Sequence, residues 1–98
     1  MNSEISKILI VDDNVKNLQV LGGFLQNEGY SVEFAIEGTS AIDWISRNSF
    51  DLVLLDIMMP GIDGYEVCRT VKKEEKNKDL PIIFLTAKID HESIIEGF

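Results

Sequence analysis

The sequence has little or none of several features, and each shortage excludes a class of protein. Cys68 is the only cysteine, so no intrachain disulfide can form, and a reducing compartment is consistent with that. No apolar run approaches the roughly 20 residues that a membrane span needs. Residues Met1–Glu4 lack the basic and then apolar pattern of a secretory signal. We therefore expect one cytoplasmic domain spanning residues 1–98.

Positive charge is also scarce. The chain has 9 Lys and Arg and 17 Asp and Glu, which gives a formal net charge of -8. Such a balance opposes binding to nucleic acid or to an anionic membrane surface, so a protein or a cation is the expected partner. The densest group of lysines ends the third predicted helix, and we interpret it as a solvated helix end rather than a docking patch. It comprises Lys72, Lys73, Lys76 and Lys78.

The chain does contain a regular alternation of strand and helix signals. Short apolar runs rich in β-branched residues predict strands at Lys7–Val11, Ser31–Ala35, Leu52–Leu55 and Ile82–Leu85. Helical periodicity predicts helices from Val15 to about Leu25, from Thr39 to Arg47, from after Asp63 to the lysine group, and from Asp90 onward.

The pattern within the strands predicts how the sheet is covered. The first and third runs are apolar throughout, which is typical of strands buried on both faces. The run at 31–35 alternates between polar and apolar side chains, so it is expected nearer an edge. Strands that alternate with helices predict an α/β fold, a doubly wound parallel sheet with helices on both faces.

Carboxylates directly follow two of these strands: Asp12 and Asp13 follow the first, and Asp56 follows the third. Ligands of doubly wound sheets bind beyond the carboxyl ends of the strands, so we expect the three acids in one pocket. Two carboxylates about 4 Å apart repel by roughly 4 kcal/mol at an effective dielectric near 20, which implies a bound cation or a raised pKa. Oxygen ligands favour Mg²⁺, with Mn²⁺ or Ca²⁺ as substitutes. Each acid taken singly could instead be a helix cap or turn residue.

Asp56 is also a candidate nucleophile. A carboxylate beside a divalent ion can take a phosphoryl group and form an aspartyl phosphate. The other phosphoryl oxygens need donors, and the Thr86 hydroxyl could be one, although Thr86 could equally be a strand-end residue. Pro60 and Gly61 predict a tight turn after Asp56, in which one backbone carbonyl could be a further metal ligand.

Three other residue types invite a functional interpretation, and each has a simpler one. Met58 and Met59 could suggest a soft-metal site, but without a nearby His or Cys they are better read as loop packing. Cys68 is expected to be a half-buried helix residue rather than a reactive thiol. His91, the only histidine, is expected near the start of the last helix, exposed or close to its cap.

Three separated segments resemble the receiver domain of bacterial two-component response regulators. They are KILIVDDN at 7–14, DLVLLDIMMPGIDG at 51–64 and PIIFLTA at 81–87. The resemblance implies that Asp56 accepts a phosphoryl group from a histidine kinase or a phosphotransfer protein. It implies that Asp12, Asp13 and Asp56 hold Mg²⁺ together with the backbone carbonyl of Met58, and that Thr86 moves toward the phosphoryl group. It also implies the flavodoxin-like strand order.

The resemblance includes one large departure. Receiver domains continue into a fifth strand, which carries a lysine followed by proline, and a fifth helix. Lys88 does not match that lysine, so we expect a truncated receiver with strand order 2-1-3-4 from a parent protein that can carry an output domain. The strand at 82–85 would then be an unpaired apolar edge, which predicts self-association.

Two other functions remain as alternatives. One is a protein-interaction module that keeps the fold without being phosphorylated. The other is a Mg²⁺-dependent aspartyl phosphatase, which resembles this chain in placing carboxylates at strand ends. Those enzymes carry the nucleophile in an Asp-x-Asp pattern on the first strand, whereas Asp12 and Asp13 are adjacent here. A phosphoacceptor domain that is not itself an enzyme is the preferred interpretation.

Overall fold

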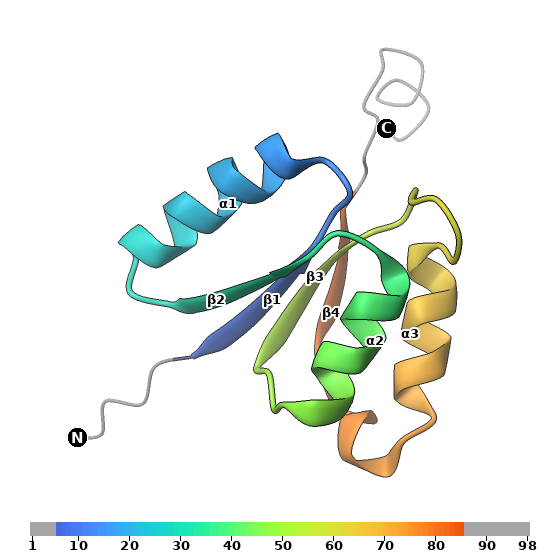
Figure 1. The fold of residues 1–98 in the computed structure, drawn as a ribbon. Coiled ribbons are helices and arrows are strands. Elements are labelled where there is room, and N and C mark those ends of the chain that lie inside the picture. Colours follow the sequence, from blue (N-terminus) through green and yellow to red (C-terminus); the bar gives the residue numbers. More distant parts are fainter. Residues whose placement is uncertain (1–5, 86–98) are drawn as a thin grey trace, which may run out of the picture.

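The fold is a parallel sheet with helices on both faces (Figure 1). The structure is a computed structural model, which describes residues 6–85. Its strands are β1 (Lys7–Val11), β2 (Ser31–Ala35), β3 (Leu52–Asp56) and β4 (Ile82–Leu85). Its helices are α1 (Val15–Asn27), α2 (Gly38–Arg47) and α3 (Gly64–Lys72), followed by the short 3₁₀ helix η1 (Glu75–Asn77). The predicted alternation is confirmed over these residues, and the helix predicted from Asp90 lies outside them. No helix within 6–85 has the length and apolar character to span a membrane.

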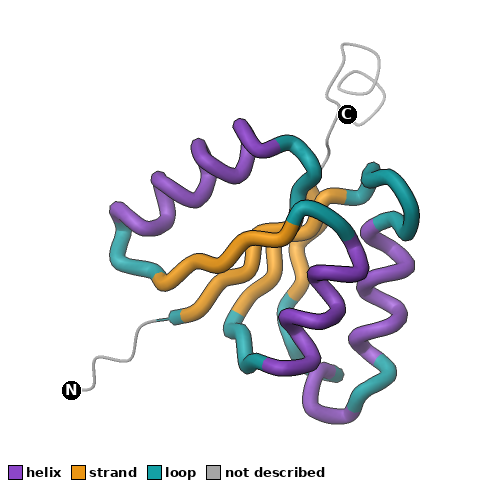
Figure 2. The backbone as a smooth tube through the Cα atoms, viewed as in Figure 1, coloured by secondary structure: helices purple, strands orange, loops and turns teal. Residues whose placement is uncertain are grey.

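The four strands lie in the order β2-β1-β3-β4 and all pair in parallel. This confirms the predicted order and the predicted edge position of β2. The register pairs Val11 with both Ala35 and Leu55, so β1 and β2 end at the same level and β3 continues one residue further, to Asp56. Figure 2 shows the carboxyl ends of the strands meeting the loops that lead to the helices at one edge of the sheet.

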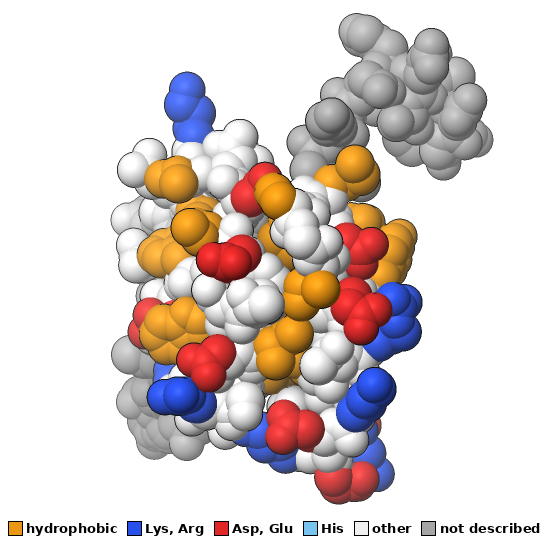
Figure 3. All heavy atoms as spheres, turned by 45° about the vertical axis from the view of Figure 1, so that its right-hand side comes forward, with side chains coloured by type: hydrophobic (Ala, Val, Ile, Leu, Met, Phe, Trp, Pro, Cys, Tyr) orange, Lys and Arg blue, Asp and Glu red, His pale blue; other side chains and the backbone are white. Residues whose placement is uncertain are grey.

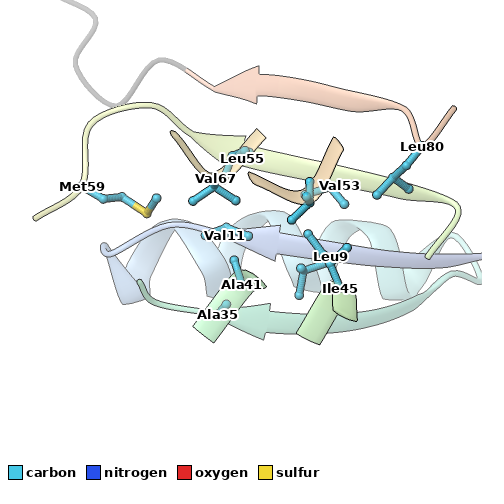
Figure 4. Close-up of a cluster of buried hydrophobic side chains, with 11 residues drawn as sticks. Leu9, Val11, Ala35, Ala41, Ile45, Val53, Leu55, Met59, Val67 and Leu80 are labelled. Atoms are coloured by element: carbon cyan, nitrogen blue, oxygen red, sulfur yellow. The ribbon is translucent and has the colours of Figure 1, made fainter. Parts of the chain in front are cut away.

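The central strands are buried on both faces, as their apolar sequence predicts. Leu9 and Val11 of β1 pack with Val53 and Leu55 of β3 in a core beneath α2 and α3, drawn in Figure 4. The alternate side chains point to the opposite face and pack against Leu18 of α1. Because β1 and β3 are fixed from both sides, the residues at their carboxyl ends are held firmly in place.

Strand β4 forms the other edge of the sheet among residues 6–85 and keeps part of its apolar surface open. Ile83 is 52% exposed and Phe84 is 37% exposed. The Phe84 ring lies 5.1 Å from the ring of Tyr65 on α3, measured between centroids. Figure 3 shows hydrophobic side chains interspersed with acidic ones on the face turned to the viewer. Self-association through this edge remains a prediction.

Candidate metal centre

Three carboxylates gather at the carboxyl edge of the sheet. Asp12 follows β1, Asp13 comes next in the chain, and Asp56 is the last residue of β3. One carboxylate oxygen from each lies within 4.8 Å of the others. Asp56 is 0% exposed and Asp12 is 3% exposed, whereas Asp13 is open to solvent. The cluster is therefore buried at Asp12 and Asp56 and open to solvent at Asp13.

The first turn of α1 holds the Asp12 carboxylate. Asp12 Oδ1 accepts a hydrogen bond of 2.9 Å from the backbone N–H of Asn14, and Oδ2 accepts one of 3.1 Å from Asn17 Nδ2. Asn14 is the N-cap of α1, and its Oδ1 accepts from the backbone N–H groups of Lys16 and Asn17 at 2.9 and 3.2 Å. The cap of α1 and the Asp12 carboxylate thus belong to one hydrogen-bonded unit.

Asp56 is held less completely. Its Oδ1 accepts a hydrogen bond of 3.2 Å from the backbone N–H of Met58. Its Oδ2 is buried and has no partner, the one such side-chain atom among residues 6–85. Burial raises the pKa of Asp56 to about 6, and the neighbouring charge of Asp12 adds to the rise. A buried carboxylate oxygen without a donor, beside two other acids, fits a site that a cation completes.

The loop after Asp56 folds back over the end of β3, as Pro60 and Gly61 predict. The backbone N–H of Gly64 donates to the carbonyl of Ile57 at 2.9 Å, and Gly61 has φ +81°. A Cβ on Gly64 would collide with the backbone carbonyl of Asp56, so the first residue of α3 must be glycine. The start of α3 is thereby packed against the backbone of Asp56, the candidate phosphoacceptor.

The remaining predicted site residues fall in two groups. Met59 is 9% exposed and packs in the core, while Met58 is 57% exposed in the loop, so the two do not form a shared ligand pair. Thr86 and His91 lie outside the described residues. Cys68 is half-buried on α3, as predicted.

Sequence reasoning missed the two asparagines that orient Asp12. Asn14 could have been found, because an Asn just before the first apolar-periodic residue of a helix is a common N-cap. Asn17 gave no signal, since its role depends on which way a single polar side chain turns at the first turn of α1.

The family model described as "Response regulator receiver domain" matches residues 8–98. The chain belongs to the receiver domain family. Receiver domains are regulatory signalling domains rather than classical enzymes. The transcriptional regulatory protein ResD of Bacillus subtilis (strain 168) is 42% identical over 93 residues, which are 95% of this chain and 38% of that protein. The chain therefore spans well under half the length of this curated relative.

Solved structures support the same assignment. Chemotaxis protein CheY4 of Vibrio cholerae superimposes with a TM-score of 0.83 at 33% identity, over 96% of this chain and 78% of that one. Response regulator protein TrrA of Thermotoga maritima, solved in complex with Mg(2+)-BeF, gives 0.80 at 42% identity, over 91% of this receiver and 76% of that chain. Both the family and the flavodoxin-like fold expected from the sequence are thus confirmed.

Proposed function

We propose that this receiver domain, residues 1–98, accepts a phosphoryl group on Asp56 in a Mg²⁺-dependent reaction. The donor would be a histidine kinase or a phosphotransfer protein, and an output domain of the parent protein would receive the resulting change. One observation carries the proposal: the buried, unpartnered Oδ2 of Asp56 lies within a cluster of three carboxylates.

The donor set fits a magnesium ion. Carboxylates of Asp12, Asp13 and Asp56, the backbone carbonyl of Met58 and water would supply the oxygen ligands that Mg²⁺ prefers. When bound, the ion neutralises charge on the incoming phosphoryl group. The complex of TrrA with Mg(2+)-BeF supports this choice by analogy. Mn²⁺ or Ca²⁺ could substitute, because both also favour oxygen ligands.

The protein groups have separate tasks in the transfer. A carboxylate oxygen of Asp56 attacks the phosphorus of a phosphohistidine, so that the O–P bond forms as the N–P bond breaks, and the released imidazole takes up a proton. A pKa of about 6 leaves Asp56 mostly ionised, and so nucleophilic, at neutral pH. Asp12 and Asp13 would hold the ion without reacting themselves. Thr86 is proposed to donate its hydroxyl proton to a phosphoryl oxygen and to move when the group is present.

A labelling experiment tests the assignment. The chain is incubated with a radiolabelled acyl phosphate and Mg²⁺ and is compared with two variants. They are Asp56→Asn and, as a control, Asp43→Asn at an exposed position of α2. We expect label on the wild type and on Asp43→Asn, and loss of label in Asp56→Asn or when EDTA removes the metal. Equal labelling of Asp56→Asn and wild type would show that another residue is the acceptor.

A further inference from the structure

We propose that Asn17 is a positioning residue of the metal site: its side-chain amide fixes the Asp12 carboxylate and thereby sets the affinity and selectivity for Mg²⁺. The inference deepens the proposed function and rests on it. It is carried by the hydrogen bond of 3.1 Å from Asn17 Nδ2 to Asp12 Oδ2, at a carboxylate that is only 3% exposed.

Both oxygens of Asp12 are tied to the first turn of α1, each by a different donor. The backbone N–H of Asn14 binds Oδ1, and the amide of Asn17 binds Oδ2. With one bond alone the carboxylate could rotate about its last side-chain torsion, which is broad and poorly restricted. With both bonds in place its plane is fixed, and each oxygen keeps a lone pair for a cation.

The backbone geometry explains why Asn17 reaches Asp12. Side chains of a helix lean toward its N-terminus, and the N-terminus of α1 directly follows the end of β1. The Asn14 cap fixes the first turn by accepting the Asn17 backbone N–H at 3.2 Å. The Asn17 side chain is therefore anchored at its own backbone before it reaches across to the carboxylate.

The neutrality of the amide matters for the function. A lysine or arginine at this position would also bind Asp12, but it would neutralise the carboxylate and repel a divalent cation. An asparagine orients the ligand and leaves the negative charge of the pocket unchanged. This is the task of groups that surround metal ligands in proteins, and their loss typically weakens metal affinity by about 10- to 100-fold.

The choice of cation gives the test its sharpest readout. Mg²⁺ demands near-ideal octahedral geometry, whereas Ca²⁺ accepts flexible coordination. If Asn17 acts by orienting Asp12, its loss must weaken Mg²⁺ binding more than Ca²⁺ binding. A general loss of fold or of charge would weaken both to the same extent.

Isothermal titration calorimetry of the whole chain at pH 8, with Mg²⁺ and with Ca²⁺, tests this. The variants are Asn17→Leu, which is close in shape but cannot donate, Asn17→Ala, which favours the helix, and Asn17→Gln, which keeps an amide. The control is Gln19→Leu, at an exposed position of the same helix. We expect the Kd for Mg²⁺ to rise about tenfold in Asn17→Leu and Asn17→Ala, and that for Ca²⁺ by less than about threefold. Asn17→Gln should recover part of the loss, and Gln19→Leu should match the wild type.

The outcomes separate this inference from the proposed function. Equal losses for the two cations, or no loss, in a variant that keeps the wild-type circular dichroism spectrum would overturn the role of Asn17 alone. Failure of the wild type to bind Mg²⁺ at millimolar concentration would overturn the proposed metal site itself, and this inference with it. If a higher Mg²⁺ concentration restores the labelling of Asp56 in Asn17→Leu, the result would support a positioning role for Asn17.

Discussion

The two ends of the sheet use their polar groups in opposite ways. At the carboxyl end, three acids lie together and Asp56 Oδ2 has no partner. At the amino end, polar side chains bind backbone groups of a strand, two helices and a loop. Asp51 Oδ2 accepts from the Lys7 N–H at 2.7 Å, Lys76 Nζ donates to the Ser46 carbonyl at 2.8 Å, Asn77 Nδ2 donates to the Val71 carbonyl at 3.1 Å, and Lys72 Nζ donates to the Leu80 carbonyl.

This difference separates stability from function within one small fold. The polar groups of the amino end bind backbone atoms, and two lysines that we interpreted as part of a solvated helix end, Lys72 and Lys76, instead donate to backbone carbonyls. Of the Lys and Arg side chains visible in Figure 3, most lie in the lower half of the view and one lies at the top. The carboxyl end keeps its charge uncompensated, and that repulsion is available to drive cation binding.

Removing one charge from the carboxyl end should have the largest effect on stability. Folding raises the pKa of Asp56 from 3.8 to about 6. At a pH where Asp56 is ionised in both the folded and the unfolded chain, its charge therefore lowers the free energy of unfolding by about 3 kcal/mol. We expect Asp56→Asn to be more stable than wild type by up to about 3 kcal/mol at pH 8 in EDTA. Urea unfolding, followed by Trp44 fluorescence, measures this difference. A variant that is no more stable would show that the repulsion is already relieved in the free protein.

The same pKa predicts a pH dependence with a definite sign. Because the pKa of Asp56 is higher in the folded state, the folded state binds the extra proton between about pH 4 and pH 6. This contribution should therefore lower stability as the pH rises through that window, by about 1 to 2 kcal/mol between pH 5 and pH 8. The comparison is made as the difference between wild type and Asp56→Asn, which cancels the other carboxyl groups. Saturating Mg²⁺ should offset the loss at pH 8 by binding the folded state.

The sequence predicted the elements and the acidic cluster because both follow from local patterns. Apolar runs give the strands, and parallel strands bring their carboxyl ends to one edge, so Asp12 and Asp56 had to meet. The partners of the acids were not predictable in this way. Whether Asn17 turns toward Asp12, or Asp56 Oδ2 stays without a donor, depends on side-chain rotamers that no periodicity records.

The glycine pair in α1 shows the same limit. Two adjacent glycines in a helix each cost about 1 kcal/mol relative to alanine unless close packing requires them. A Cβ on Gly22 would lie 2.5 Å from the Phe34 ring of β2, whereas one on Gly23 would meet nothing within 4 Å. The sequence shows two equivalent residues, and only the placement of α1 over β2 shows that a side chain at Gly22 would displace the Phe34 ring whereas one at Gly23 would displace nothing.

Breaking a bond at the amino end should destabilise the protein without affecting the metal. Asn77 is 5% exposed, and its truncation in Asn77→Ala removes the hydrogen bonds from Nδ2 to the Val71 carbonyl and to Glu74 Oε1, although the Glu74 N–H still donates to that carbonyl at 3.2 Å. We expect a loss of about 1 kcal/mol in urea unfolding. The Kd for Mg²⁺ of the folded variant should equal that of wild type. Gln26→Ala, on the exposed side of α1, is the control and should change stability by less than about 0.5 kcal/mol. A change in metal affinity in Asn77→Ala would mean that the two ends are coupled.

The smallest effect is expected where a carboxylate at the amino end becomes an amide. Asp51→Asn keeps an acceptor oxygen for the Lys7 N–H but loses the negative charge that strengthens this exposed bond. We expect a loss of about 0.5 to 1 kcal/mol, the opposite sign to that of Asp56→Asn, although both changes remove one carboxylate from a strongly acidic chain. Asp79→Asn, at an exposed position near the same loops, controls for the change in net charge. If Asp51→Asn were as stabilising as Asp56→Asn, the gain at Asp56 would reflect overall charge rather than the crowded carboxyl end.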